Sequence, residues 1–379
     1  MFLSKSVELF TSRIGKLKKI LKSKGVQSFL ITGDENVFYL TGFYGKDSGS
    51  LLLLTEDSLY LLVHFIYLEQ AKKSIHIKNI NIVCYRKNKF GKLVEMIDGY
   101  NFKNLMFEGK NISFGDFDRL RKLLSGQKKK LISIEGMVEK LRVIKDGLEI
   151  SRIEKACRTA DKVYKGIISL SASGIRSYKE IELAYKMEEL MIKNNSSGKA
   201  FDIIVAYDKN SSLPHYNPGN KKIKKGLILI DFGCRFENYC SDITRTIFTG
   251  SNKICNEFKK IYDIVLEAQL MAIGECREGM DCRKLDEVAR NFIESKGYGD
   301  NFGHGLGHGV GLEIHEDPVI STESKAVLKE NMVITIEPGV YIENFGGVRI
   351  EDMILVKKNG CEVLTRSNKV FFIPDRVRS

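Results

Sequence analysis

The chain has 379 residues, of which 43% are hydrophobic and 28% are charged, with only 5 prolines. This composition excludes a collagen, a disordered tail and a small disulfide scaffold, and the length exceeds the roughly 250–300 residues at which a single core usually splits, so two domains are expected. Lysine and arginine exceed the acidic residues by 60 to 48, a net charge of +12. The lysines nevertheless form scattered clusters without interleaved aromatic residues, which favours solvated faces over a nucleic-acid site.

The first third of the chain alternates between helical and strand patterns. Apolar residues recur at three- and four-residue steps over 7–21, which predicts a helix that ends before Gly25. A second helical pattern covers 114–124. Short apolar runs occupy 28–31, 37–40, 51–54, 59–63, 80–85, 104–107 and 131–134. These runs predict a small α/β domain whose strands are largely buried.

The remainder of the chain repeats one order of elements. Helical patterns cover 147–174, 178–193, 256–276 and 283–296. Strand-rich sequence follows the second helix of each pair, first up to Thr249 and then to the end of the chain. The recurrence of helix, helix, strands predicts one α+β domain with two related halves, although no repeat is visible in the sequence itself. We expect the α/β domain over residues 1–133 and the α+β domain over residues 134–379.

The sequence shows neither a zinc-finger motif nor a targeting segment. None of the 8 cysteines forms a C-x-x-C pair. No apolar run approaches the roughly 20 residues of a membrane helix, and the N-terminal residues lack an apolar stretch of signal-peptide length. We therefore expect reduced thiols in a cytoplasmic protein, with no membrane and no nucleic acid as partner.

Two aspartates flank a predicted hairpin in the second domain. Asp231 ends the apolar run 227–230, and Asp242 opens an alternating strand pattern after a turn that contains Asn238. An antiparallel hairpin would bring the two carboxylates together. Taken alone, they would more often be two ordinary aspartates beside a turn.

A glycine-rich segment over 302–315 carries histidines. Its glycines oppose a helix, since each costs about 1 kcal/mol there, so we expect His304 and His308 on an irregular strand and loop. Four of the 6 histidines of the chain lie in the C-terminal half, namely His215, His304, His308 and His315. A single histidine is more often a core residue, but this clustering favours a functional interpretation.

Two glutamates complete a set of potential metal ligands. Glu337 ends the apolar run 333–336, and Glu351 lies within a strand pattern. Four carboxylates and one imidazole on neighbouring buried strands require cations, because burying isolated charges is costly. Carboxylate-rich ligation with one histidine favours Mn²⁺, Co²⁺ or Fe²⁺ over a cysteine-bound zinc, and two ions about 3.5–4 Å apart can activate a water. The residues therefore predict metal-assisted hydrolysis.

The contexts of these ligands resemble a known family. In chain order they are LIDFG, SDITRT, GHGLGHGVGLEIHE, TIEPG and GGVRIED. They are similar to the motifs of the pita-bread metallopeptidases, and within them to the aminopeptidase P and prolidase branch. This resemblance implies an α/β N-terminal domain plus an α+β pita-bread catalytic domain with two pseudo-symmetric halves. It also implies a homodimer and two divalent metal ions, with Mn²⁺ expected and Co²⁺, Fe²⁺ or Zn²⁺ as alternatives.

The resemblance further implies roles for individual residues. The metal ligands would be Asp231, Asp242, His308, Glu337 and Glu351. Asp242 and Glu351 would bridge the ions, and Glu337 would also act as general base. The remaining catalytic residues would be His215 beside the scissile bond, with His304 and His315 contacting the substrate and shuttling protons. Arg349 would hold metal-binding carboxylates in place, and Tyr341 would lie near the active site. Asn238 stands where the family often has glycine, a change that a turn tolerates.

The activity implied is proline-specific exopeptidase cleavage, on peptides with proline in the second position. An Xaa-Pro bond has no N–H, so it needs a site that does not depend on that donor. We expect an Xaa-Pro aminopeptidase, with an Xaa-Pro dipeptidase (prolidase) as the alternative. Methionine aminopeptidase fits less well because of the N-terminal domain and Arg349. A non-catalytic pita-bread binding module is a remote alternative, since such modules have lost metal ligands.

Overall fold

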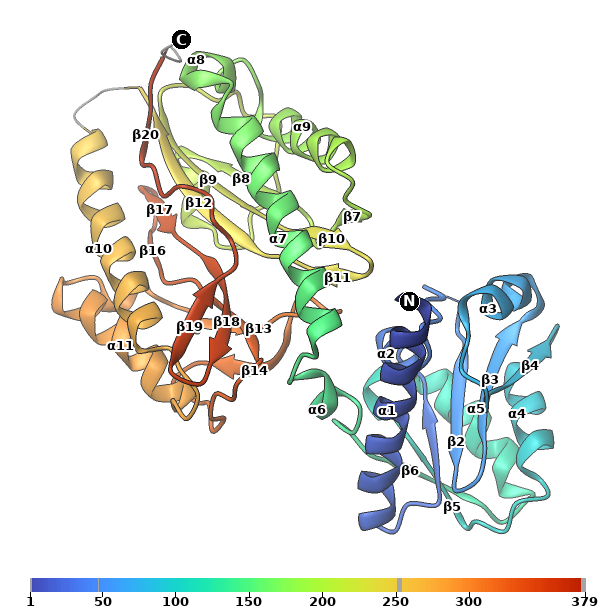
Figure 1. Ribbon diagram of the computed structural model, residues 1–379. Coiled ribbons are helices and arrows are strands. Elements are labelled where there is room, and N and C mark those ends of the chain that lie inside the picture. Colours follow the sequence, from blue (N-terminus) through green and yellow to red (C-terminus); the bar gives the residue numbers. More distant parts are fainter. Residues whose placement is uncertain (1, 47, 251–253, 376–379) are drawn as a thin grey trace. The chain divides into compact units, whose positions relative to one another are not determined.

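The computed structural model describes residues 2–46, 48–250 and 254–375. The chain divides into two compact units, Met1–Arg142 (unit 1) and Val143–Ser379 (unit 2) (Figure 1). Within the described ranges, no helix is both long enough and apolar enough to cross a membrane.

Unit 1 is a mixed sheet with helices on both faces. Its helices are α1 (Phe2–Ser23), α2 (Asp34–Thr41), α3 (Leu68–Ser74), α4 (Lys89–Ile97), α5 (Phe114–Ser125) and α6 (Glu139–Arg142). Its strands are β1 (Ser28–Ile31), β2 (Leu51–Thr55), β3 (Leu59–His64), β4 (Asn81–Tyr85), β5 (Asn104–Phe107) and β6 (Lys130–Ser133). The spatial order is β4-β3-β2-β1-β5-β6, with β1, β2 and β3 antiparallel and the outer pairs parallel.

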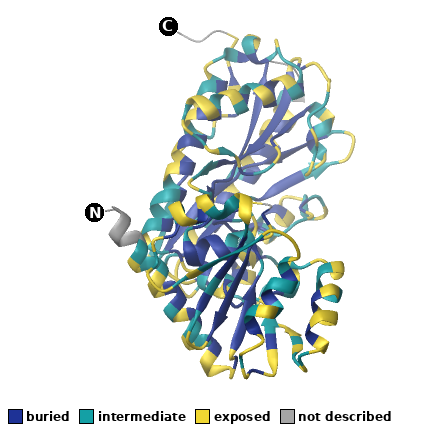
Figure 2. Ribbon diagram, turned by 90° about the vertical axis from the view of Figure 1, so that its right-hand side faces the viewer, coloured by how far each residue is buried: buried dark blue, intermediate teal, exposed yellow. Residues whose placement is uncertain are grey.

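The central strands of unit 1 are buried on both faces, as their continuous apolar runs predict. Leu30 and Leu53 pack against α4 and α5, while the alternating neighbours Phe29 and Leu52 are also fully buried. Figure 2 shows these strands in the buried colour between helices with exposed outer sides.

One expected strand of unit 1 is wrong. Residues 37–40 lie in α2 and not in a strand. Asp34 and Glu35 in the first turn complement the helix dipole, and Gly42 ends the helix in the left-handed conformation with its N–H donated to the carbonyl of Phe38. A short, fully buried helix and a buried strand have the same apolar pattern, so the flanking residues decide between them. Helices α3 and α4 were not predicted.

Unit 2 repeats a helix pair and a mainly antiparallel sheet. The helices are α7 (Gly147–Ile168), α8 (Ser171–Ile175), α9 (Glu180–Lys193), α10 (Ile254–Glu275) and α11 (Cys282–Ser295). The strands of the first half are β7 (Gly198–Lys199), β8 (Ile204–Tyr207), β9 (Gly226–Phe232), β10 (Cys234–Phe236), β11 (Tyr239–Cys240) and β12 (Ile243–Thr249). Those of the second half are β13 (Gly307–Gly309), β14 (Glu316–Ile320), β15 (Val333–Ile336), β16 (Gly339–Ile342), β17 (Gly346–Arg349), β18 (Asp352–Lys357), β19 (Gly360–Val363) and β20 (Phe372–Ile373).

The two halves have separate apolar cores. In the first, α7 and α9 pack on the sheet β20-β12-β9-β8, with Tyr164 and Met187 against Ile228. In the second, α10 and α11 pack on the sheet β14-β13-β15-β18-β19, with Val265 and Ala289 in one cluster with residues of β15 and β18. The recurrence predicted from element order is therefore present in the structure.

The expected helix over 147–174 is interrupted. Helix α7 begins with a capping box between Asp146 and Glu149 and ends at Ile168, and α8 then covers Ser171–Ile175. Ser171, the first residue of α8, has a φ of +61°, a left-handed conformation that the interior of one continuous α-helix would not contain. The apolar stripe continues through both helices, so periodicity alone does not reveal the interruption.

Candidate metal centre

Asp231 and Asp242 come from paired strands of the first half. Strands β9 and β12 are antiparallel, with Asp231 opposite Thr244 and Phe232 opposite Ile243. Asp242 immediately precedes β12, so both carboxylates lie at the same end of this ladder. The intervening hairpin turns at Glu237 and Asn238, whose φ values of 45° and 71° require residues that tolerate the left-handed region. Asp231 and Asp242 are only 8% and 5% exposed.

His308 lies in β13, where the flanking glycines are required by close packing. A Cβ on Gly307 would come within 2.1 Å of the Thr335 carbonyl oxygen, and one on Gly309 within 2.2 Å of the Asp317 carbonyl oxygen. The glycines therefore allow β13 to lie close to its neighbouring segments. The Nδ1 of His308 is 3.0 Å from the carbonyl oxygen of Gly309, which can only accept, so Nδ1 carries a hydrogen. This leaves Nε2 as the atom that can bind a metal.

Glu337 and Glu351 are brought together by the pairing of β15 with β18. Ile336 lies opposite Asp352 in this antiparallel pair, so Glu337, after β15, and Glu351, before β18, are neighbours. The Oε1 of Glu337 is 3.3 Å from the Nε2 of His308. Glu351 is 2% exposed and accepts a hydrogen bond of 2.7 Å from the hydroxyl of Thr244.

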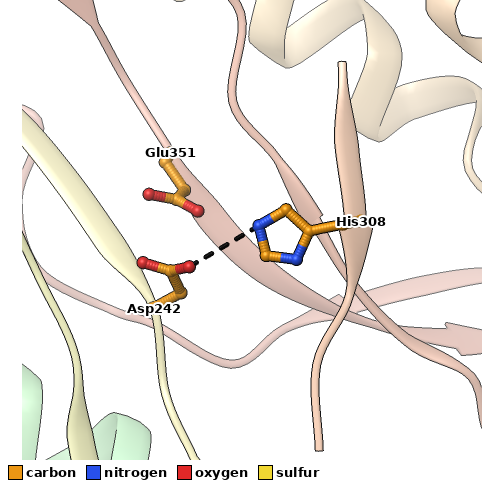
Figure 3. A group of neighbouring side chains, drawn as sticks. All are labelled: Asp242, His308 and Glu351. Atoms are coloured by element: carbon orange, nitrogen blue, oxygen red, sulfur yellow. Dashed lines mark ion pairs between the residues drawn. The ribbon is translucent and has the colours of Figure 1, made fainter. Parts of the chain in front are cut away.

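Asp242, His308 and Glu351 point toward one another from three different segments (Figure 3). Each offers a ligand atom within 4.8 Å of the others. The Oδ2 of Asp242 lies 3.7 Å from the Nε2 of His308. Asp231 and Glu337 extend this cluster, since the charges of both raise the pKa of Asp242. The ligands expected from the sequence thus lie in one buried cluster.

The electrostatics of the cluster fit bound cations. Burial raises the pKa of Asp231, Asp242 and Glu351, and the neighbouring carboxylates raise it further. Among the described residues, one oxygen of each of these carboxylates is buried without a hydrogen-bond partner. Buried carboxylate oxygens without donors are costly unless a cation compensates them. An oxygen-rich set with one imidazole suits Mn²⁺, Co²⁺ or Fe²⁺.

Glu337 and His308 shift each other's pKa in opposite directions. Burial acts to raise the pKa of Glu337, but the hydrogen bond and charge of His308, together with the charges of His304 and Arg349, outweigh it and lower this pKa to about 2. Conversely, burial acts to lower the pKa of His308, while the hydrogen bond and charge of Glu337 leave it raised. When His308 takes up a second proton, that proton lies on Nε2, the atom that would otherwise bind a cation. Metal binding at His308 displaces that proton.

Arg349 connects the cluster to Tyr341 and His304. Its Nη2 donates to Asp231 Oδ2 at 2.6 Å, and its Nη1 donates to the Tyr341 hydroxyl at 2.6 Å. The Tyr341 hydroxyl in turn lies 3.0 Å from Nε2 of His304, whose Nδ1 is 2.8 Å from the Gly305 carbonyl oxygen. The Nδ1 of His304 is thus the donor, and Nε2 accepts from Tyr341. Burial raises the pKa of Tyr341 to about 12 and lowers that of His304.

His315 and His215 lie at the exposed side of the site. The His315 ring is 4.4 Å from the His308 ring in an edge-to-face arrangement. Burial and the charges of His308 and His215 lower the pKa of His315. Both His315 and His215 are exposed. They therefore have rings that a substrate can reach, whereas the metal-ligand candidates are mostly enclosed.

A buried ion pair lies directly beside His315. The Nζ of Lys145 is 3.1 Å from Oε2 of Glu316, with side chains 1% and 6% exposed. The other oxygen of Glu316 accepts the backbone N–H groups of Leu312 and Glu313. This ion pair and these hydrogen bonds hold the segment that carries His315 in position.

Two threonines that the sequence interpretation missed organise the carboxylates. The hydroxyl of Thr244 accepts from Nε of Arg349 at 3.0 Å and donates to Glu351. The hydroxyl of Thr335 accepts from the backbone N–H of His308 at 3.0 Å and donates to Glu337 at 3.0 Å. Thr335 is two residues from Glu337, the spacing that puts side chains on one face of a strand, and this spacing could have indicated it from the sequence. Thr244 is 107 residues from Glu351, so no local spacing indicates that contact.

Comparisons with known proteins identify the family of this chain. The model of "Metallopeptidase family M24" matches residues 151–358, and that of "Creatinase/Prolidase N-terminal domain" matches residues 13–144. The Xaa-Pro dipeptidase of Pyrococcus horikoshii is 39% identical over 365 residues, 96% of this chain and 99% of that protein.

Solved structures extend the likeness to the fold. The Xaa-Pro dipeptidase from Bacillus anthracis has a TM-score of 0.89 at 34% identity, covering 96% of this chain and 100% of that chain. The X-Pro aminopeptidase from Thermotoga maritima has a TM-score of 0.82 at 35% identity, covering 92% and 98%. The α/β domain plus pita-bread architecture expected from the sequence is confirmed. The chain belongs to metallopeptidase family M24, and it carries the N-terminal domain found in creatinases and prolidases.

Proposed function

We propose that this protein is an Xaa-Pro dipeptidase, which hydrolyses the bond between an N-terminal residue and proline in a dipeptide. The observation that carries the hydrolytic assignment is the buried carboxylate cluster around His308, which includes oxygens that receive no hydrogen bond from the part of the chain that the structure describes. Relatives named Xaa-Pro dipeptidase, 39% identical over nearly the whole chain, favour the dipeptidase over the aminopeptidase that we first expected. Both activities remain within family M24.

The metal-binding residues of the proposal are Asp231, Asp242, His308, Glu337 and Glu351. They would hold two divalent ions, with Mn²⁺ as the expected metal and Co²⁺, Fe²⁺ or Zn²⁺ as alternatives. Such ions polarise a carbonyl and make a water acidic enough to attack near neutral pH. Metal analysis of the purified protein should give two ions per chain, and a single ion or none would contradict this part of the proposal.

The chain's own residues carry the proton transfers and orient the substrate. Glu337 takes a proton from the attacking water, whose oxygen bonds to the scissile carbonyl carbon. The carbon–nitrogen bond then breaks, and the proton held by Glu337 passes to the imino nitrogen of the leaving proline. His215 and His315, with exposed rings, steer the dipeptide, while Tyr341 and Arg349 hold His304 and Asp231 in place. Because proline contributes no N–H, this recognition works through the carbonyl and the ring.

The test is hydrolysis of matched Xaa-Pro and Xaa-Pro-Yaa peptides after chelation and re-addition of Mn²⁺ or Co²⁺. We expect cleavage of the dipeptide and little cleavage of the tripeptide. Efficient cleavage of the tripeptide would instead identify an aminopeptidase. If neither is cut, and Xaa-Ala and Met-Xaa controls are also uncut, the enzymatic assignment fails.

We also propose that the protein is a homodimer, as the sequence resemblance implies. Light scattering coupled to size-exclusion chromatography would show twice the chain mass, and a monomer at working concentrations would contradict this. The cytoplasmic location stays a prediction from the sequence.

A further inference from the structure

His215 lies on an irregular segment between two strands of the first half. We call residues 208–219, which follow β8 and form the first part of its connection to β9, the His215 loop. It opens with a 3-10 turn over Asp208–Ser212 and continues through the exposed residues Leu213 and His215. An exposed segment of this kind has few conformational constraints of its own, so its geometry must come from the contacts it makes.

One buried carboxylate holds this loop at both ends and in its middle. Glu180, in the first turn of α9, is 0% exposed. Its Oε1 accepts the backbone N–H of Tyr207 and the side-chain amide of Asn210, both at 2.8 Å. Its Oε2 accepts the hydroxyl of Tyr216 at 2.7 Å and the backbone N–H of Gly219 at 3.3 Å. These donors span the whole His215 loop, and Tyr216 adjoins His215.

The donors are also connected to one another. The amide of Asn210 donates to the Tyr216 hydroxyl at 2.8 Å, so that hydroxyl accepts from Asn210 while it donates to Glu180. Burial and the adjoining carboxylate of Glu180 raise the pKa of Tyr216 to about 12, so its hydroxyl keeps its proton. All donors of this hydrogen-bond network therefore point toward Glu180, which is their common acceptor.

The opposite side of the loop rests on the strand that leads to the metal centre. The backbone N–H of Gly347, in β17, donates to the hydroxyl of Ser211 at 2.9 Å. A Cβ on Gly347 would lie 2.3 Å from the carbonyl oxygen of Ser211, so only glycine fits this contact. Strand β17 ends at Arg349, which binds Asp231. The His215 loop is thus held between Glu180 and a segment of the metal centre.

We propose that Glu180 is a positioning residue for substrate binding, which acts through the His215 loop and not through the metal ions. This inference rests on the proposed function, because it takes His215 to contact the substrate. Replacing Glu180 by glutamine keeps the size and one acceptor oxygen but directs an NH₂ group at donors. In one orientation of the glutamine amide, its nitrogen replaces Oε2 and faces the N–H of Gly219. In the other orientation, its nitrogen replaces Oε1 and faces the N–H of Tyr207. Either orientation places one donor against another.

The first experiment compares Glu180→Gln with the control Glu182→Gln in the full-length, metal-loaded protein. Glu182, on the same helical turn, caps α9 through the N–H of Lys179, and glutamine can retain that bond. We expect Glu180→Gln to lower kcat/KM for an Xaa-Pro dipeptide by about tenfold, mainly through KM, since displaced positioning groups cost rate at this scale. Metal content should equal that of wild type, and Glu182→Gln should behave as wild type. Equal effects of the two variants would overturn the proposal.

A double-mutant cycle separates positioning from general structural damage. In a His215→Ala background, Glu180→Gln should lower kcat/KM less than twofold, because the residue through which Glu180 acts is already gone. An undiminished tenfold loss in that background would show that Glu180 acts elsewhere. Tyr216→Phe, which removes one donor and leaves the others, should fall between wild type and Glu180→Gln.

A measurement without turnover keeps this inference distinct from the proposed function. Amide hydrogen exchange of residues 208–219 should be faster in Glu180→Gln than in wild type or Glu182→Gln, with the strands β9 and β12 unchanged. If wild type cleaves no Xaa-Pro peptide, but exchange in residues 208–219 is selectively faster in Glu180→Gln, the proposed function fails and the anchoring by Glu180 stands. If exchange in the loop does not change, the anchoring itself is wrong.

Discussion

Each unit of the molecule buries acidic side chains, and the two units stabilise them differently. In unit 1, Glu108 is 3% exposed and accepts hydrogen bonds from the backbone N–H groups of Thr32 and Gly33 and from the amide of Asn36, at 2.8, 2.9 and 2.8 Å. Protein donors thus serve both oxygens of Glu108, although the nearby Glu139 shares the amide of Asn36 and adds its own charge. Burial still raises the pKa of Glu108 to about 7.

In unit 2, several carboxylates face one another and share fewer donors. Arg349 serves Asp231, and Thr244 serves Glu351, while one oxygen of each, and one of Asp242, is buried without a partner among the described residues. Hydrogen bonds can therefore compensate one buried carboxylate, but a cluster of like charges needs cations as well. This contrast indicates a metal site in one unit and a structural carboxylate in the other.

Removing one metal ligand should produce the largest effect. Asp242→Asn should lower kcat/KM on the order of 10³-fold or more, because it removes a ligand shared by the cluster. The control is Asp202→Asn, at a side chain that is 85% exposed. After chelation, however, Asp242→Asn should unfold at a higher temperature than metal-free wild type, since it removes one of the repelling charges. A lower unfolding temperature in chelator would contradict the charge argument.

The same cluster predicts proton release on metal binding. The pKa values of Asp242 and Glu351 are raised in the metal-free protein, so these groups retain protons above their ordinary range and lose them when a cation binds. Metal-free stability should accordingly fall, and apparent Mn²⁺ affinity should rise, as the pH increases. Calorimetric titrations in buffers of different ionisation enthalpy would count the protons; a buffer-independent heat would refute the prediction.

The Lys145–Glu316 pair is intermediate between the hydrogen-bonded Glu108 of unit 1 and the carboxylate cluster of unit 2, because one lysine compensates one buried carboxylate. Lys145→Met should destabilise unit 2 by about 3–5 kcal/mol, since it leaves Glu316 buried without this cation. The double variant Lys145→Met/Glu316→Gln should recover most of the loss. Denaturant unfolding of the metal-loaded protein would measure both, and an equally unstable double variant would mean that the packing of Lys145 matters and not its charge.

Glu108 should make unit 1 less stable as the pH rises. Its folded pKa of about 7 lies above the ordinary value of 4.5, so the stabilising protonated form is present at low pH and is lost as the pH passes through 7. The change between about pH 5 and pH 8 is at most about 3 kcal/mol. Glu108→Gln has no group that titrates at this position. With both proteins in chelator, the unfolding temperature of the variant minus that of wild type should therefore increase from pH 5 to pH 8. A difference that stays constant with pH would show that the hydrogen bonds keep Glu108 ionised.

The smallest effect is expected at Tyr341. Tyr341→Phe removes the hydroxyl that connects Arg349 to His304, and kcat should fall about tenfold with both metal ions retained. Tyr185→Phe, at a side chain that is 62% exposed, is the matched control. Loss of metal from Tyr341→Phe would instead mean that this hydroxyl supports the ligands themselves.

Local patterns predicted the elements and the ligands that depend on near neighbours. The alternation before Asp231 and Glu337 indicated strands that end at a carboxylate, and the glycines around His308 indicated a close backbone approach. The same patterns failed at 37–40, where a buried helix and a buried strand have the same apolar pattern. They also failed at Ser171, where a left-handed residue interrupts the helix although the apolar pattern continues.

The sequence by itself determined which residues are candidates for metal binding and the order of elements that carries them, because both depend on spacing along the chain. Only the tertiary structure decided which carboxylates have donors and which need cations. Tyr216 and Glu180 are 36 residues apart, and Arg349 and Asp231 are 118 apart, yet each pair is joined by one short hydrogen bond. Such partners meet only when the strands and helices pack, and their supply of donors distinguishes a structural carboxylate from a metal ligand.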